Sequence, residues 1–430
     1  MTDFDVIRLN SNTLDFAARF SALVNARREA DEDVSRDVAA IIARVKAEGD
    51  SAVADLTATF DGHNLAWRID IPTCQAALDG LDADLRAALE LAADRIRTYH
   101  TKQRPEDSDS VDPVGVRIGA RWTAVDAAGV YVPGGRAAYP SSVLMNLIPA
   151  KVAGVSRVVM VTPTPGGEAN PLVLAAAALA GADEVWRIGG AQAVAALAYG
   201  TDTITPVDVI TGPGNAWVAE AKRQLFGVVG IDMVAGPSEI VVVADGANNP
   251  DWIAADLLSQ AEHDPTSQSI LFTDDSAFAD AVAAAVERQL LTLSTAPVAR
   301  ASWEANGAII VVGNLDETPA LVDRLAPEHL ELAVENPEPL FKAIRHAGSI
   351  FLGRYTPEAV GDYVGGPNHV LPTGRRARFS SGLSVLDFMK RTSFLGCTAE
   401  SIRAIGPAAV ALANAEGLPA HAASVQERLI

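Results

Sequence analysis

From about residue 125 onward, short β-branched runs alternate with Ala-rich stretches, and this alternation limits the fold more than any other feature. Because a strand–helix–strand order produces parallel sheets covered by helices, we expect an α/β fold. A ligand cleft is then expected between two units, at the carboxyl ends of the strands. The predicted strands are 157–162, 184–188, 207–211, 240–244, 269–273, 308–312 and 349–352, and the predicted helices are 171–180, 192–199, 216–225, 252–263, 276–290 and 318–325.

The length of 430 residues exceeds what one hydrophobic core usually supports, so more than one domain is expected. Residues 14–60 and 82–99 have helical periodicity. We predict two Rossmann-like parallel-sheet units with a helical segment at each end. The predicted division is an N-terminal helical segment at 1–30, a first α/β domain at 31–129 plus 239–380, an inserted second α/β domain at 130–238, and a helical tail at 381–430.

Charge and composition exclude several classes of protein. The formal net charge is −20, which argues against a nucleic-acid binder, since such proteins need a basic surface. The longest apolar runs are less than half of the ~20 residues that a membrane span needs, and the start resembles no secretory signal. Cys74 and Cys397 are too far apart in sequence for a metal-ligand motif. We therefore expect a cytoplasmic protein without disulfide bonds.

Three glycine turns follow apolar runs in the predicted second domain, although the GxGxxG fingerprint is absent. They lie at 131–135, 189–192 and 212–215 and carry Tyr131, Gln192 and Asn215. Glycine at a strand-to-helix turn lets a phosphate approach backbone N–H groups at the positive end of a helix. One such turn is more often a tight connection than a binding site. Three in one unit favour a nucleotide site.

Four of the 7 histidines lie in polar stretches that also carry a carboxylate, and histidine is both a neutral-pH acid/base and the commonest metal ligand. Each stretch alone also fits a structural role: a capped helix end, an exposed loop pair, an ordinary Gly/Pro loop or an exposed tail. Together they suggest a metal site joined to acid/base chemistry. The stretches contain Gln260 with His263, Glu328 with His329, Asp362 with His369, and Glu416 with His421.

In this order and spacing, the motifs resemble those of the histidinol dehydrogenase family, and the resemblance runs from about Arg27 to His421. Ten motifs carry it: YVPGG at 131–135, PSSVLMN at 140–146, GGAQAVAAL at 189–197, GPGNAW at 212–217, GIDMVAGPSE at 230–239, QAEHD at 260–264, PEHLE at 327–331, GDYVGGPNHVLPT at 361–373, FSSGLSVLDFMKR at 379–391 and AEGLPAH at 415–421.

The resemblance implies a zinc enzyme that oxidises L-histidinol to L-histidine with two NAD⁺, and a homodimer in which the tail of one subunit completes the site of the other. By residue, it implies zinc ligands at Gln260, His263, Asp362 and His421, an acid/base pair at Glu328 and His329, further substrate contacts at Ser238, His369 and Glu416, and NAD contacts at Tyr131, Gln192 and Asn215. The metal ligands and His329 would also contact the substrate.

Two oxidation steps need two kinds of proton transfer. His329 is the candidate base for the alcohol, and Glu328 is the candidate to activate water for the aldehyde. Three other interpretations stay open: a related dehydrogenase of another small polar alcohol, a metal-binding protein without turnover, and a thiol-type aldehyde dehydrogenase. The Glu328/His329 pair argues against pure metal binding, and the absence of a cysteine from the site motifs argues against the thiol mechanism.

Overall fold

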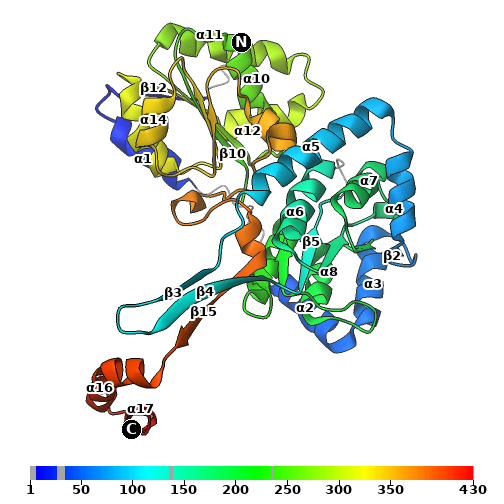
Figure 1. Ribbon diagram of the computed structural model, residues 1–430. Helices are drawn as coiled ribbons and strands as arrows, with labels where there is room; N and C mark the ends of the chain where they lie inside the picture. Colours follow the sequence, from blue (N-terminus) through cyan, green and yellow to red (C-terminus); the bar gives the residue numbers. More distant parts are fainter. Residues whose placement is uncertain (1–5, 27–33, 135–138, 235, 430) are drawn as a thin grey trace.

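Two six-stranded sheets form the body of the molecule, and a long arm extends from it (Figure 1). The computed structural model describes residues 6–26, 34–134, 139–234 and 236–429. The predicted α/β class with parallel sheets is confirmed, because neighbouring strands pair in parallel throughout the first sheet and in all but one pair of the second.

The first sheet contains the segments with the titratable motifs, and helices cover both of its faces. Alternate residues of β10 pack into the two opposite cores, as expected for a strand whose side chains point alternately to each face. In strand order the sheet is β1 (Ile7–Asn10), β12 (Ala308–Val311), β11 (Gln268–Thr273), β10 (Glu239–Ala244), β13 (His329–Ala333) and β14 (Ser349–Leu352). One face packs against α10 (Pro250–Ala261), α11 (Ser276–Leu290) and α12 (Ala296–Asn306), and the other against α1 (Phe16–Asn25), α13 (Thr318–Leu325) and α14 (Glu338–Ala343).

The second sheet contains the glycine turns and is also covered on both faces. Its order is β2 (Arg68–Ile69), β7 (Glu184–Trp186), β6 (Arg157–Val161), β5 (Ala127–Tyr131), β8 (Val209–Thr211) and β9 (Gly230–Ile231), with β2 antiparallel to β7. One face packs against α4 (Ile71–Asp79), α5 (Ala83–Thr101), α6 (Pro140–Ala153) and α7 (Pro171–Ala180), and the other against α2 (Ser35–Glu48), α3 (Asp50–Asp61), α8 (Gly190–Tyr199) and α9 (Ala216–Leu225).

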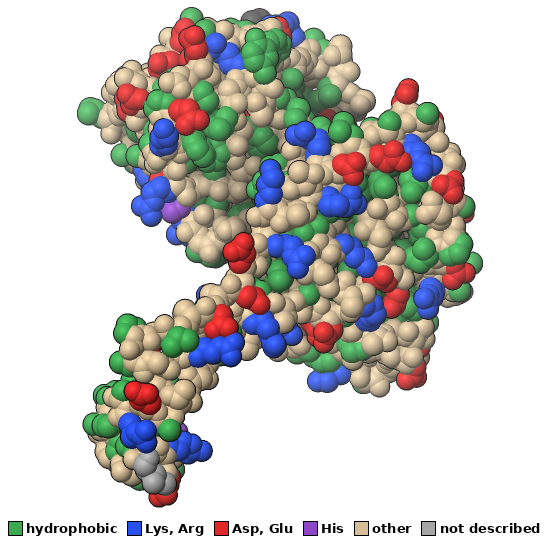
Figure 2. Space-filling model, in the orientation of Figure 1, with side chains coloured by type: hydrophobic (Ala, Val, Ile, Leu, Met, Phe, Trp, Pro, Cys, Tyr) green, Lys and Arg blue, Asp and Glu red, His purple; other side chains and the backbone are tan. Residues whose placement is uncertain are grey.

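The arm is a three-stranded antiparallel sheet followed by two helices at its far end (Figure 1). In the space-filling view it projects away from the body (Figure 2). The tail at 381–430 was expected to be helical, and this is wrong for its first part, because β15 pairs with β4 along eight residues. The arm consists of β3 (Ser108–Val111), β4 (Arg117–Ala124), β15 (Met389–Gly396), α16 (Ala399–Ala415) and α17 (Pro419–Gln426).

The structure divides the chain differently from the predicted domain boundaries. The segment 31–129 was grouped with the first sheet, but its helices α2 to α5 pack on the second sheet. The N-terminal segment contains β1, which adds an edge strand to the first sheet by pairing with β12. The chain crosses from the second sheet to the first between β9 and β10, in the segment that contains Gly236, Pro237 and Ser238. The domain boundaries therefore follow the hydrophobic cores: each segment belongs to the sheet against which its apolar side chains pack.

Candidate active site

Three of the four titratable stretches meet at the amino-terminal edge of the first sheet, namely those with Gln260 and His263, Glu328 and His329, and Asp362 and His369. His329 is the first residue of β13, and it lies beside the start of β10. The cleft was expected at the carboxyl ends of the strands in both units, and for this sheet the expectation is wrong. The reason is local: Ala326 adopts a left-handed conformation before Pro327, and this turn delivers Glu328 and His329 at the strand entrance.

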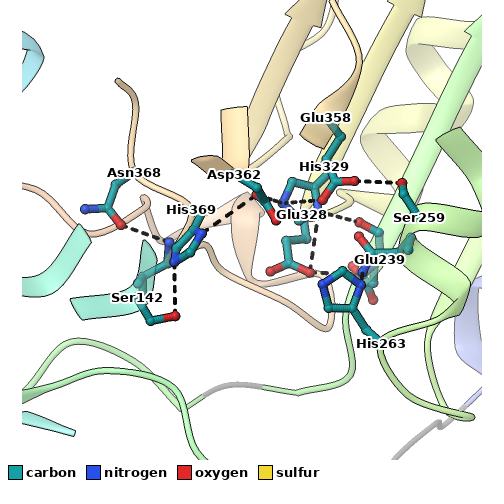
Figure 3. Close-up of polar contacts among 12 residues, drawn as sticks. Ser142, Glu239, Ser259, His263, Glu328, His329, Glu358, Asp362, Asn368 and His369 are labelled. Carbon is teal, nitrogen blue, oxygen red and sulfur yellow. Dashed lines mark hydrogen bonds and ion pairs between the residues drawn. The ribbon is translucent and has the colours of Figure 1, made fainter. Parts of the chain in front are cut away.

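Glu328 and His329 are both held by the backbone of one residue, Glu239, at the start of β10 (Figure 3). The N–H of Glu239 donates to Oε2 of Glu328 at 3.0 Å, and the carbonyl oxygen of Glu239 lies 3.0 Å from Nδ1 of His329. Because a carbonyl only accepts, Nδ1 carries the proton and donates it. Nε2 of His329 is therefore the nitrogen with a free lone pair, and this nitrogen can act as a base.

Burial sets the protonation of this pair. Glu328 is 6% exposed and His329 is 4% exposed. Loss of solvent raises the pKa of Glu328 well above its usual value, while the backbone N–H of Glu239 acts in the opposite direction. Loss of solvent also lowers the pKa of His329, against the opposing effect of the nearby Asp362 carboxylate. The imidazole is therefore neutral and ready to accept a proton.

A second group of side chains surrounds the free Nε2 of His329 (Figure 3). Oε1 of Glu358 lies 3.7 Å from this nitrogen and Oδ1 of Asp362 lies 3.8 Å from it. The same Asp362 oxygen lies 3.9 Å from Nδ1 of His369. Burial raises the pKa of Asp362 and Glu358 and lowers that of His369. His329, Glu358 and Asp362 each offer one ligand atom within 4.8 Å of the others, so they form a candidate metal site.

Glu358 was missed in the sequence. It lies four residues before Asp362, in a short helix, α15 (Glu358–Val360), that continues into a π-helical turn at Gly361–Gly365. Side chains four residues apart in a helix lie on one face, and this spacing could have identified it. Ser259 donates its hydroxyl to Oε2 of Glu358 at 3.1 Å, which connects this carboxylate to α10.

Gln260 and His263 lie at the end of α10, as predicted. Nε2 of Gln260 lies 3.4 Å from Nδ1 of His263, and Gln260 is buried while His263 is exposed. His263 is close enough to Asp362 and Glu358 to lower the pKa of each carboxyl. The structure therefore brings three of the four predicted zinc ligands to one place.

The nitrogen and oxygen atoms that these side chains bring together fit a cation such as zinc. Three buried polar atoms in this part of the described chain have no hydrogen-bond partner: Oε1 of Gln260, Oε1 of Glu358 and Nε2 of His329. An unpaired buried polar atom costs about 1–3 kcal/mol, so a partner for these atoms would stabilise the fold. Histidine nitrogen and carboxylate oxygen are typical zinc ligands.

Two predicted residues lie far from this centre within one chain. Glu416 ends α16 and His421 lies on α17, so both belong to the exposed end of the arm (Figure 1). Ser238 does lie at the edge of the site, one residue before Glu239, and its carbonyl oxygen accepts the N–H of Gln268 at 3.0 Å. His369 connects the site to the second sheet, because its Nε2 lies 3.3 Å from the hydroxyl of Ser142 on α6.

The predicted cofactor residues all lie at the carboxyl-terminal edge of the second sheet. Tyr131 ends β5, and its hydroxyl accepts the N–H of Gly190 at 3.0 Å. Burial raises the pKa of Tyr131 to about 12, so the phenol stays neutral. Gln192 is buried in the first turn of α8, and Asn215 caps α9 by accepting the N–H of Val218 at 3.2 Å. Gly135, the last residue of the first glycine turn, lies outside the described residues.

The fold and site define a two-domain α/β enzyme with a buried acid/base pair, a cation-type donor set and a separate edge of glycine turns. The histidinol dehydrogenase family model matches residues 24–429. Histidinol dehydrogenase of Zymomonas mobilis subsp. mobilis is 65% identical over 427 residues, covering 99% of both chains. The Rhodospirillum rubrum enzyme is 63% identical and covers 98% of both. The crystal structure of histidinol dehydrogenase from Elizabethkingia anophelis superposes with a TM-score of 0.94 at 36% identity, covering 99% of this chain and 98% of that one.

This chain belongs to the histidinol dehydrogenase family. It is therefore an oxidoreductase, and the sequence resemblance is confirmed over almost its whole length.

Proposed function

We propose that the chain performs the histidinol oxidation of its family as two successive dehydrogenations, through L-histidinaldehyde, with two NAD⁺ reduced. The final product is L-histidine, which places the enzyme at the end of histidine biosynthesis. The observation that carries the mechanism is the fixed orientation of His329, whose Nδ1 is occupied by Glu239 and whose Nε2 points into the donor set.

One zinc ion per subunit is proposed, with Gln260, His263 and Asp362 as ligands from one chain. The convergence of these side chains and the unpaired Gln260 oxygen support this assignment. When bound, zinc would anchor the imidazole and amine of the substrate and polarise its hydroxyl. The ligand atoms of His329, Glu358 and Asp362 lie within 4.8 Å of one another, so His329 and Glu358 are also close enough to share a metal with Asp362. The zinc content of variants decides which of these side chains bind the metal.

In the first step His329 takes the proton of the alcohol while a hydride leaves for NAD⁺. The lowered pKa keeps Nε2 unprotonated before the step, and the Glu239 carbonyl stabilises the imidazolium that forms, because its oxygen faces Nδ1–H. The products of this step are the aldehyde, NADH and one proton.

In the second step water adds to the aldehyde, and the resulting diol gives up the second hydride. Glu328 is the proposed base for this water, since its raised pKa makes the ionised carboxylate a strong proton acceptor. A thiol route has no support in the geometry: Cys74 is buried in the core of the second sheet, and Cys397 is exposed on the arm. Replacing both with Ser should leave most of the activity.

NAD⁺ is proposed to bind at the edge formed by Tyr131, Gln192 and Asn215. Helices α8 and α9 begin at the glycine turns there, and the N-terminus of a helix favours the binding of a phosphate group. The side-chain oxygen Oε1 of Gln192 is buried without a hydrogen-bond partner in the described structure, which fits a group that contacts a ligand.

A homodimer is proposed in which Glu416 and His421 act in the site of the partner subunit, with Glu416 contacting substrate and His421 completing the zinc ligands. The support is the arm, which carries both residues away from the body of their own chain (Figure 1). Mixing an inactive His329→Asn chain with an inactive His421→Ala chain tests this. Recovery of activity through mixed dimers supports shared sites, and absence of recovery under conditions of subunit exchange contradicts them.

No helix in the described part of the chain is long and apolar enough to cross a membrane. A cytoplasmic location is proposed, and the two unpaired cysteines fit the reducing conditions there.

The decisive experiment measures NADH formed per L-histidinol consumed by zinc-loaded enzyme, with and without a chelator. Two NADH per substrate, lost with the chelator and restored by zinc, are expected. One NADH per substrate would contradict the second oxidation step. No NADH from histidinol would point to oxidation of another small polar alcohol.

A further inference from the structure

A buried ion pair lies directly behind the third glycine turn. Lys222, on α9, pairs with Asp232, which follows β9, and the two side chains are 3% and 1% exposed. A buried ion pair is weak evidence for stability, because the charges lose their hydration on burial. Stability alone therefore does not explain this ion pair, and its contacts indicate another role.

Both members of the pair bind the backbone of one residue, Gly212. Lys222 Nζ donates to the carbonyl oxygen of Gly212 at 2.9 Å, and Oδ2 of Asp232 accepts the N–H of Gly212 at 2.8 Å. The other carboxylate oxygen of Asp232 accepts the N–H of Met233 at 2.6 Å. The peptide groups on both sides of Gly212 are thus fixed by charge-assisted hydrogen bonds, which are stronger than neutral ones.

Gly212 packs closely against the backbone of Tyr131, at the end of β5. Its φ is +110°, and a Cβ added to it would meet the carbonyl oxygen of Tyr131 at 2.0 Å. The turn therefore lies against the backbone of Tyr131 on one side and against the ion pair on the other. Asn215, three residues later, begins α9, so the position of Gly212 also determines where the N-terminus of this helix points.

We infer that Lys222 and Asp232 are positioning residues for NAD⁺: they hold the Gly212–Asn215 turn in the conformation that receives the cofactor. This inference rests on the proposed cofactor site. Neither side chain needs to touch NAD⁺, since both are buried behind the turn. A turn that is fixed before binding loses little conformational entropy when the cofactor arrives, and loosening it should weaken cofactor binding.

The test replaces the pair by apolar residues with the same number of side-chain heavy atoms or one fewer, as Lys222→Met with Asp232→Leu. Removal of one partner alone would leave a buried charge and destabilise the fold, whereas removal of both avoids this. We expect the KM for NAD⁺ to rise about tenfold, while the KM for histidinol changes less than about twofold. An unchanged KM for NAD⁺ in the folded double variant overturns the inference.

A control uses another ion pair of the same domain, Lys151 with Asp183, which is more exposed (29% and 39%) and lies at the opposite edge of the second sheet. Lys151→Met with Asp183→Asn should leave the KM for NAD⁺ unchanged. An equal rise in this control would mean that general loosening of the domain explains the effect, which also overturns the inference.

If the apolar pair does not fold, Lys222→Gln with Asp232→Asn keeps polar groups beside Gly212 and removes the charges. A KM for NAD⁺ raised about threefold is then expected, because neutral hydrogen bonds are weaker, and no rise counts against the inference. Gln192→Ala separates this result from failure of the cofactor site itself. If Gln192→Ala raises the KM for NAD⁺ and the ion-pair variants do not, only the positioning role fails; if none does, the proposed site fails.

Discussion

The functional edges of the two sheets differ in what they offer a ligand. The amino-terminal edge of the first sheet brings together buried titratable groups, and burial shifts the pKa of Glu328, His329 and Asp362. The carboxyl-terminal edge of the second sheet offers glycine turns, helix N-termini and the neutral side chains of Tyr131 and Gln192. Under the proposed function, one α/β unit would carry the proton transfers and the other would hold the cofactor.

This difference shows why opposite ends of the strands are used. Helix N-termini lie at the carboxyl ends of parallel strands, and they suit an anionic cofactor. The amino ends lack that positive field, and there the turn before β13 and the end of α10 deliver side chains instead. If the comparison holds, variants at the first edge should lower turnover, and variants at the second edge should weaken cofactor binding.

The largest effect is expected for His329→Asn. The amide keeps much of the size of the imidazole but cannot accept the alcohol proton, so kcat should fall about 10³-fold. Zinc content, measured by atomic absorption, and histidinol binding, measured by calorimetry, should stay close to those of the wild type. His346→Asn, on the same domain but outside the site, is the matched control. Loss of zinc from the His329 variant would show that His329 is a ligand, and the assigned role would fail.

The next effect is expected for Glu328→Gln, which removes the proposed base for water and keeps a polar side chain beside the N–H of Glu239. The aldehyde step should slow about 100-fold and the alcohol step less than about tenfold. Single-turnover reactions started from histidinol and from histidinaldehyde measure the two steps separately. Equal slowing of both steps would count against a role in water activation.

At the second edge, Asn215→Asp should raise the KM for NAD⁺ about tenfold and leave kcat nearly unchanged. The new carboxylate still caps α9 but repels the phosphates of the cofactor. Asn215→Ser is the control, since Ser also caps a helix and adds no charge. Thermal unfolding should be similar for all three proteins. A fall in kcat without a change in KM would mean that the two edges are not separated in function.

The smallest effect is expected for the pH dependence of the free energy of unfolding, through buried carboxyl groups beside and within the first sheet. Burial raises the pKa of Asp256 to about 6, beside Glu331, whose pKa is also raised well above its usual value by burial. A carboxyl with a raised pKa in the folded state binds its proton more tightly there, so the contribution of Asp256 to stability is greatest at low pH and is lost as the pH rises from about 4 through 6. Asp256→Asn should remove part of this fall, by about 1–2 kcal/mol at pH 7. Urea unfolding at pH 5 and pH 7 checks it; an identical pH dependence in both proteins would contradict it.

Most of the fold was predictable because β-branched runs and Ala-rich helices differ strongly in local pattern. The seven predicted strands from 157 to 352 all correspond to strands of the two sheets. β15 was missed, because its partner β4 lies more than 260 residues earlier and most of its residues are exposed on the arm. The strand that begins at His329 is not among the predicted strands, since the buried Glu331 interrupts its apolar pattern.

The site was predictable to the extent that it depends on side chains with characteristic chemistry. Histidines and carboxylates in polar stretches, together with the family resemblance, led to His263, His329 and Asp362, which the structure brings close together. The backbone contacts of Glu239 could not be predicted, because every residue type except proline has the same N–H and C=O. Which end of each sheet is used also depends on tertiary packing and leaves no local pattern.

The backbone contacts of Glu239 make the acid/base geometry resistant to mutation. Nineteen of the twenty amino acids provide the same N–H and C=O at this position, so almost any point substitution there preserves both contacts unless it disturbs the surrounding core. Proline is the exception, since it has no N–H and would release Glu328. The buried Glu239 carboxylate also helps to raise the pKa of Glu328, so such substitutions would keep the alignment of the Glu328–His329 pair while changing its proton affinity.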